Sequence, residues 1–154
     1  MSQNENEYHK KTAAKCFNEA WDYLDKKNRT TDDEQQMLHL AHAARYHRNF
    51  VGTPRNFAIG DWQISRVYAA INEPSLALRF AKSSLEITQK NNLSENLPSA
   101  YEGMARAYVI AKQNSSARDY IKKARDALKV AKIDAEDKKI YSDQIDETEA
   151  LLKQ

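Results

Sequence analysis

The sequence predicts an all-α protein on three observations. The 154 residues include only 3 Gly, 3 Pro and 1 Cys, whereas strong helix formers such as Ala, Leu, Lys and Glu are abundant. Apolar residues recur every three or four positions over long segments, which is the spacing of an amphipathic helix. These segments are joined by connections of about 2–6 residues, so consecutive helices are expected to pack antiparallel.

The first three helices are predicted from the residues that begin and end them. The first is expected over residues 5–27, where apolar side chains such as Phe17 and Leu24 share one face. The second is expected to begin at the run Thr31-Asp32-Asp33-Glu34, which is typical of a capping box. The segment Gly52-Thr53-Pro54 ends that helix and begins the third, with Thr as N-cap and Pro in the first turn.

Four further helices are predicted in the rest of the chain. The segment Asn72-Glu73-Pro74-Ser75 separates the third helix from the fourth. The fourth continues to the turn Asn91-Asn92-Leu93-Ser94, and the fifth follows it to Lys112. The sixth is expected over residues 114–132, and the seventh begins at Asp134.

A shift of 40 residues aligns the middle of the chain with itself. A large apolar residue, a small residue and an aromatic recur in the same order on one helix: Ile64, Ser65 and Tyr68, then Met104, Ala105 and Tyr108. On the next helix small or apolar residues recur: Ala77, Ala81 and Ser84, then Ala117, Ile121 and Ala124. Repeated hairpins cannot bury their faces alone, so the repeat predicts a stacked array.

On these residues the chain resembles the tetratricopeptide-repeat (TPR) family over residues 57–132. The resemblance implies one domain, a right-handed superhelix of about three antiparallel helical hairpins plus a C-terminal capping helix. Its units are a degenerate first hairpin (5–51), two repeats (54–92 and 95–132) and the capping helix (134–154). The period of 40 is longer than the usual TPR repeat of about 34 residues. Asn72 and Lys112 stand where the family carries a turn glycine.

The resemblance also implies a site, because the first helix of each TPR hairpin lines a concave groove that holds peptides. The candidate partner-binding residues are Trp62, Gln63, Arg66, Glu102 and Arg106. Two arginines beside an exposed Trp suit an acidic peptide, since guanidinium groups bind carboxylates bidentately. Chaperone-binding members carry a Lys/Asn clamp, and Trp62 and Glu102 stand in its place here. The alternative is that both arginines pair with acidic residues across the repeats and that Trp62 packs between helices.

The stretch between Glu34 and Asp61 contains no acidic residue and supports an alternative function. A basic cluster there suits a small molecule or an anion such as phosphate, beside the helix start at Thr53-Pro54. Its candidate members are His42, Arg45, His47 and Arg55. His39 and His42 are three residues apart on one helix but lack a third ligand, so no metal site is predicted, and both are expected on the solvated face.

No catalytic motif is found, and the chain is predicted to be a protein-binding scaffold without a cofactor rather than an enzyme. Cys16 follows two alanines and has no His near it in the sequence, so it is expected to be a small core residue. A net charge of +2 with both signs interspersed disfavours nucleic acid as a partner. No segment is long and apolar enough to span a bilayer, and the N-terminus is polar, so a cytoplasmic protein is expected. Homodimerisation through an apolar end face is left open.

Overall fold

The computed structural model describes residues 1–154 and contains only helices, without a strand. The helices are α1 (Gln3–Leu24), α2 (Thr31–Val51), α3 (Pro54–Ala70), α4 (Pro74–Lys90), α5 (Leu97–Ile110), α6 (Asn114–Val130) and α7 (Ala135–Leu151), with a short 3-10 turn, η1 (Ser94–Asn96), before α5. The predicted all-α class is confirmed. None of the seven helices combines the length and the apolarity that crossing a bilayer requires.

Four helices begin at a side-chain cap, in which the side chain accepts a hydrogen bond from a backbone N–H three residues further on. Thr53 caps α3, as predicted, and Asp134, the predicted start of the seventh helix, is the cap that precedes α7. The cap of α2 is Thr30, so Thr31 is the first helical residue rather than the cap. Ser2 caps α1, which therefore begins before residue 5, and the helix ends at Leu24 rather than at residue 27.

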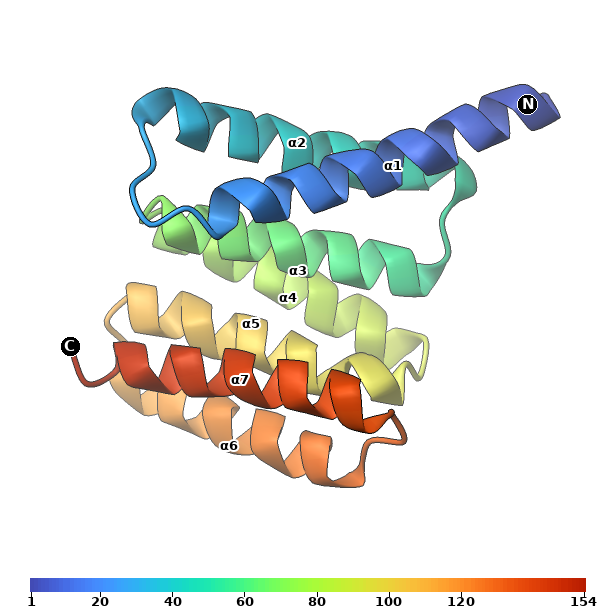
Figure 1. Ribbon diagram of the computed structural model, residues 1–154. Coiled ribbons are helices and arrows are strands. Elements are labelled where there is room, and N and C mark those ends of the chain that lie inside the picture. Colours follow the sequence, from blue (N-terminus) through green and yellow to red (C-terminus); the bar gives the residue numbers. More distant parts are fainter.

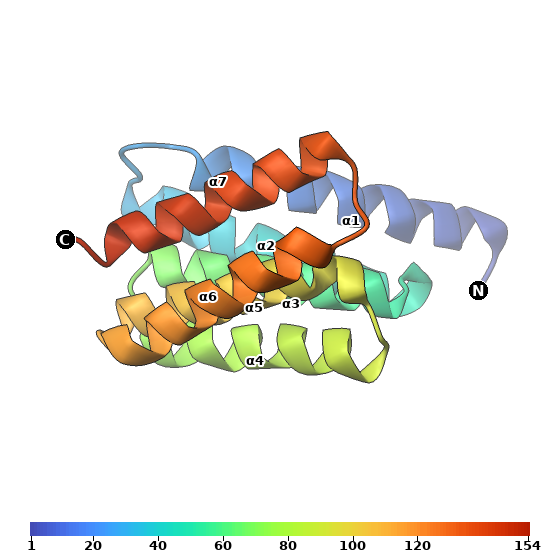
Figure 2. The ribbon, with the colours of Figure 1, turned by 90° about the horizontal axis from the view of Figure 1, so that it is seen from below.

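The helices form three hairpins that stack in order, with α7 against the last one (Figure 1). α1 packs on α2, α3 on α4, and α5 on α6 and α7. The four helices α1, α3, α5 and α7 run in one direction. α1 and α7 lie on the same side of α3 and α5 (Figure 2), so α3 and α5 are covered from both sides. This position explains why α3 carries apolar residues on two faces.

The 40-residue repeat of the sequence is also a repeat of backbone geometry. Shifting the bounds of α3 and α4 by 40 residues moves the end of α3 onto the end of α5, and α4 onto α6. The turns agree as well, because Asn72 and Lys112 have φ of 59° and 60°. In each turn the next residue's N–H reaches the carbonyl of Tyr68 or Tyr108 at 2.9 Å. Both residues therefore adopt the left-handed conformation that a helix-ending glycine would adopt.

The core consists of three successive clusters of small and medium apolar side chains. The first joins α1, α2 and α3, the second joins α3, α4 and α5, and the third joins α5, α6 and α7. Alanines such as Ala41, Ala77 and Ala117 are fully or almost fully buried. Beside these alanines, an aromatic pair stacks in each repeat, Tyr68 on Phe80 and Tyr108 on Tyr120, with ring centroids 5.6 Å apart in both.

Candidate binding groove between α1 and α7

Two cavities lie on the side of the molecule that α1 and α7 share, above the floor made by α3 and α5. The first has a volume of about 270 Å³ and is mainly apolar, with Phe17, Ile59 and Ile140 in its lining. The second has a volume of about 480 Å³ and a mixed lining, in which apolar side chains adjoin charged ones that include Arg66, Arg106 and Glu147. Trp21 of α1 lines both cavities, so the two lie on either side of this residue or next to it. We call the two together the α1/α7 groove.

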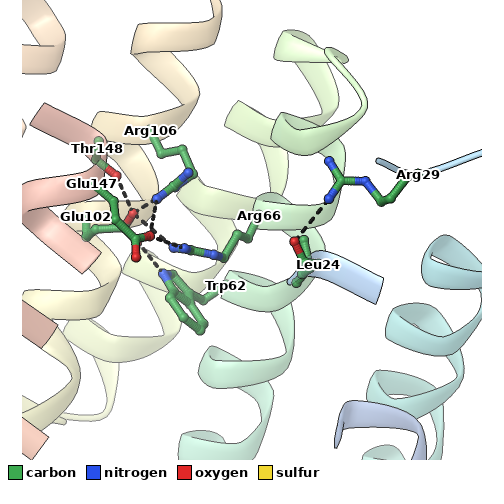
Figure 3. A network of polar contacts seen from close by, with 8 residues as sticks. All are labelled: Leu24, Arg29, Trp62, Arg66, Glu102, Arg106, Glu147 and Thr148. Atoms are coloured by element: carbon green, nitrogen blue, oxygen red, sulfur yellow. Dashed lines mark hydrogen bonds and ion pairs between the residues drawn. The ribbon is translucent and has the colours of Figure 1, made fainter. Parts of the chain in front are cut away.

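A buried carboxylate, that of Glu102 on α5, organises the floor of the groove (Figure 3). Four side chains on α3, α5 and α7 donate hydrogen bonds to its two oxygens: Trp62 Nε1 (2.8 Å), Arg106 Nε (2.9 Å), Thr148 Oγ1 (2.7 Å) and Arg66 Nη1 (3.4 Å). The side chain of Glu102 is 1% exposed. One carboxylate thus joins three helices, and its hydrogen bonds fix the directions of both guanidinium groups.

Burial disfavours the charged forms of the side chains in this network, and the neighbouring opposite charges favour them. Burial by itself raises the pKa of Glu102, but the guanidiniums of Arg106 and Arg66 and the hydrogen bonds from Thr148 and Arg106 outweigh it, so the pKa lies below its ordinary value. Burial lowers the pKa of Arg66, opposed by Glu102 and Glu147 and reinforced by the like charge of Arg106. Arginine has so high a reference pKa that Arg66 is still a cation at neutral pH.

Arg66 lies at the centre of the groove. Its guanidinium carbon is 5.2 Å from the ring centroid of Trp21 and 5.7 Å from that of Trp62, within the range of cation–π attraction. Its Nη2 donates to Glu147 on α7 at 2.9 Å. Arg106 Nη2 is 3.7 Å from the same Glu147 oxygen and, although buried, has no hydrogen-bond partner. The polar end of the groove therefore contains an unsatisfied guanidinium nitrogen.

The predicted partner-binding residues are brought together, but not all of them face the groove. Arg66, Arg106 and Trp62 line the cavities. Trp62 is only 7% exposed, however, so the prediction that it is exposed is wrong, and the alternative that it packs between helices is confirmed. Gln63 and Glu102 are buried, and Gln63 Nε2 donates to the Phe17 carbonyl of α1 at 2.9 Å. The reason is that α1 and α7 cover the faces of α3 and α5 that a more open array would expose.

Trp21, Arg29 and Glu147 line the groove but were not predicted to be site residues. Arg29 Nη1 donates to the Leu24 carbonyl at 3.0 Å, close to the C-terminal end of α1 (Figure 3). Trp21 lies on α1, a helix that the 40-residue shift of the sequence does not align. Glu147 lies on α7, which is largely polar and has only two buried residues, Ile145 and Thr148. No sequence signal separates Glu147 from the other acidic residues of that helix.

Three of the four residues of the predicted basic cluster each contact a different side chain outside the cluster. Arg45 Nε donates to Asp61 at 2.9 Å, and its guanidinium covers the ring of Phe57. His42 Nε2 is 2.9 Å from the Tyr68 hydroxyl. The prediction that His42 is solvated is therefore wrong, because it packs against the α3/α4 hairpin, whereas His39 is exposed.

The other two members of the basic cluster lie apart from these contacts. His47 Nδ1 is 2.7 Å from His9 Nδ1 on α1, and Arg55 is exposed at the start of α3. An anion site at these four residues stays a prediction. No group of three or more His, Cys, Asp or Glu side chains is placed to hold a metal ion.

Cys16 lies on α1 and is partly buried. Burial raises the pKa of its thiol, and Glu19 adds to the effect. A raised pKa keeps the thiol protonated at neutral pH, whereas a nucleophile needs the thiolate. The side chains that do converge in the groove are aromatic rings, guanidiniums and carboxylates, which are groups that bind and orient a ligand.

Comparison of the chain with models of protein families gives no match, and comparisons with curated proteins and with solved structures give none either.

Proposed function

We propose that this protein is a non-enzymatic interaction module that binds a peptide or partner helix in the α1/α7 groove. The observation that carries the proposal is the pairing of two adjoining cavities, one apolar and one lined by two arginines. Binding sites commonly combine an apolar cavity with a few convergent polar groups, which fix orientation and specificity. The groove has both parts.

The size of each part suits a peptide. The apolar cavity, of about 270 Å³, is just below the range of drug-sized ligand pockets, and it suits a single large side chain. The polar cavity is larger and presents Arg66 and Arg106, which can donate hydrogen bonds to a peptide carboxylate or to backbone carbonyls. A segment in both cavities would lie over Trp21, which supplies a rigid aromatic surface.

The order of the helices supports a TPR-like architecture as part of this proposal. In that family the first helices of successive hairpins line the peptide groove, and here α3 and α5 are such helices and form the groove floor. The matching turns at Asn72 and Lys112 support a duplicated hairpin unit. The resemblance therefore agrees with the location of the cavities.

Ile140 provides a direct test, because it lines the apolar cavity and is 45% exposed, so that Ile140→Asp leaves the core intact. Val130, at the end of α6 and 79% exposed, is the matched control for the same change outside the groove. Peptides are selected from a displayed random library on the wild-type protein, resynthesised with a fluorophore, and titrated by fluorescence anisotropy.

We expect Ile140→Asp to weaken binding by about tenfold or more, since an interface anchor is worth over 1 kcal/mol. Val130→Asp should leave the affinity unchanged. Selected peptides that bind Ile140→Asp and wild type equally, or a selection that yields no binder, would contradict the proposed function.

A further inference from the structure

We infer that Arg66 and Arg106 form a carboxylate-exchange site, in which Glu147 of α7 occupies the place that a carboxylate of the bound peptide takes. This inference rests on the proposed function and specifies its ligand chemistry. It also assigns Glu147 a role as a competitor built into the chain.

The charges at the polar end of the groove call for one more anion besides Glu102. Arg66 and Arg106 are two cations with side chains only 11% and 14% exposed, and the fully buried Glu102 supplies one negative charge between them. Glu102 is held by hydrogen bonds from both arginines, Trp62 and Thr148, so it cannot leave. Partly buried cations need a second counter-charge, and Glu147 provides it.

Glu147 fits this place only in part. Its Oε2 is 2.9 Å from Arg66 Nη2 but 3.7 Å from Arg106 Nη2, which exceeds hydrogen-bonding distance. Arg106 Nη2 is buried and has no acceptor. A carboxylate arriving from the groove can place one oxygen on each arginine, because it is not restricted by attachment to α7. The unsatisfied nitrogen thus favours an external carboxylate over Glu147.

Glu147 is also free to leave. Its side chain is 61% exposed, and its only ion pairs are those with the two arginines. Its neighbours Asp146 and Glu149, by contrast, are both paired with Arg125 on α6. Exchange replaces one carboxylate by another and returns Glu147 to water, so no charge is left buried without a partner. Arg66 stays in place beside Trp21 and Trp62 throughout.

The test compares Glu147→Gln with Glu149→Gln, which makes the same change of charge two residues away at a contact outside the groove. The probes are the peptides selected on the wild-type protein, each resynthesised in three forms: with a free C-terminus, with a C-terminal amide, and with every Asp and Glu replaced by Asn and Gln. Affinities are measured by fluorescence anisotropy at constant ionic strength.

We expect Glu147→Gln to bind a carboxylate-bearing peptide about tenfold more tightly than wild type if Glu147 fills the site nine-tenths of the time. Glu149→Gln should resemble wild type, and a peptide form without its essential carboxylate should lose this gain. Loss on amidation identifies the C-terminal carboxylate as the ligand group, and loss on replacement of Asp and Glu identifies a side chain.

The inference is overturned if Glu147→Gln and Glu149→Gln raise the affinity equally, or if peptides without any carboxylate bind as tightly as the originals. It is also overturned if inorganic phosphate displaces the peptide from Glu147→Gln while acetate at matched ionic strength does not. In each of these cases the peptides still bind, and the proposed function stands. If no selected peptide binds Ile140→Asp more weakly than wild type, both the proposed function and this inference are overturned.

Discussion

The hairpins α3/α4 and α5/α6 have matching turns and matching aromatic stacks. Asn72 and Lys112 have nearly equal φ, and the ring pairs Tyr68–Phe80 and Tyr108–Tyr120 stack at the same separation. These features lie within one hairpin and depend on its own residues. The two hairpins can therefore have the same turn and the same aromatic stack.

The hairpins differ where they face each other. Trp62 of α3 corresponds to Glu102 of α5, and the indole donates a hydrogen bond to that carboxylate. Gln63 corresponds to Gly103, where an added Cβ would be 2.9 Å from the Trp62 ring. Two tryptophans could not form this hydrogen bond, and two buried glutamates would repel each other. Contact between two copies requires complementary residues, so these positions have to differ.

The largest effect on the free energy of unfolding is expected from a substitution of Glu102, which removes this complementarity. Glu102→Gln keeps the shape but removes the charge that two partly buried arginines share. Its amide N–H₂ also faces a donor. Loss of one partner of a buried ion pair costs about 3–5 kcal/mol, so we expect a decrease of that size in the free energy of unfolding. Urea denaturation measures it.

The control for Glu102→Gln is Asp143→Asn, which removes the exposed ion pair with Lys139 and should change stability little. A loss below about 1 kcal/mol for Glu102→Gln would show that the network contributes little to stability.

The shared turns give a second, smaller effect that sharpens the comparison. Lys112 carries a Cβ in the left-handed conformation, which is unfavourable for most residues, whereas Asn tolerates it. We expect Lys112→Gly to raise the free energy of unfolding by about 0.5–1 kcal/mol. Asn72→Gly should change it by less than about 0.5 kcal/mol. Equal effects of the two substitutions in thermal or urea denaturation would mean that the two turns are not strained differently.

The difference between contacts within a hairpin and contacts between hairpins also decides what could be predicted from the sequence. Local chemistry was sufficient for the caps at Thr53 and Asp134 and for the hairpins, because each depends on residues close in the chain. The contact of Arg66 with Glu102 confirms the alternative that the arginines pair with acidic residues across the repeats. Its contact with Glu147 was not predictable, because Glu147 lies 81 residues away and reaches Arg66 only through the placement of α7. Periodicity shows which faces of α3 are apolar, but not which helix covers each face. The burial of Gln63 was missed for that reason, and the burial of Trp62 was only one of two interpretations.

The smallest effect is a pH dependence expected at only one of the two aromatic stacks. His42 contacts the Tyr68 hydroxyl and the Phe80 ring, whereas the corresponding position of the next repeat is Lys82. Burial lowers the pKa of His42, opposed by Asp61 and reinforced by His39. The unfolded chain therefore binds the proton more readily than the folded protein, so stability falls as the pH drops below the ordinary value of about 6.5.

We expect the free energy of unfolding of the wild type to decrease between pH 7.5 and about pH 5.5 more steeply than that of His42→Gln, which keeps a polar group against Tyr68 but cannot titrate. His47 also has a pKa lowered by burial and by His9, but it is present in both proteins, so its contribution cancels in the difference. His39→Gln is the matched control, since His39 is exposed on the same helix, and it should retain most of the wild-type slope. Equal slopes for His42→Gln and the wild type would show that the contact with Tyr68 tolerates the imidazolium. The two stacks would then be equivalent in chemistry as well as in geometry.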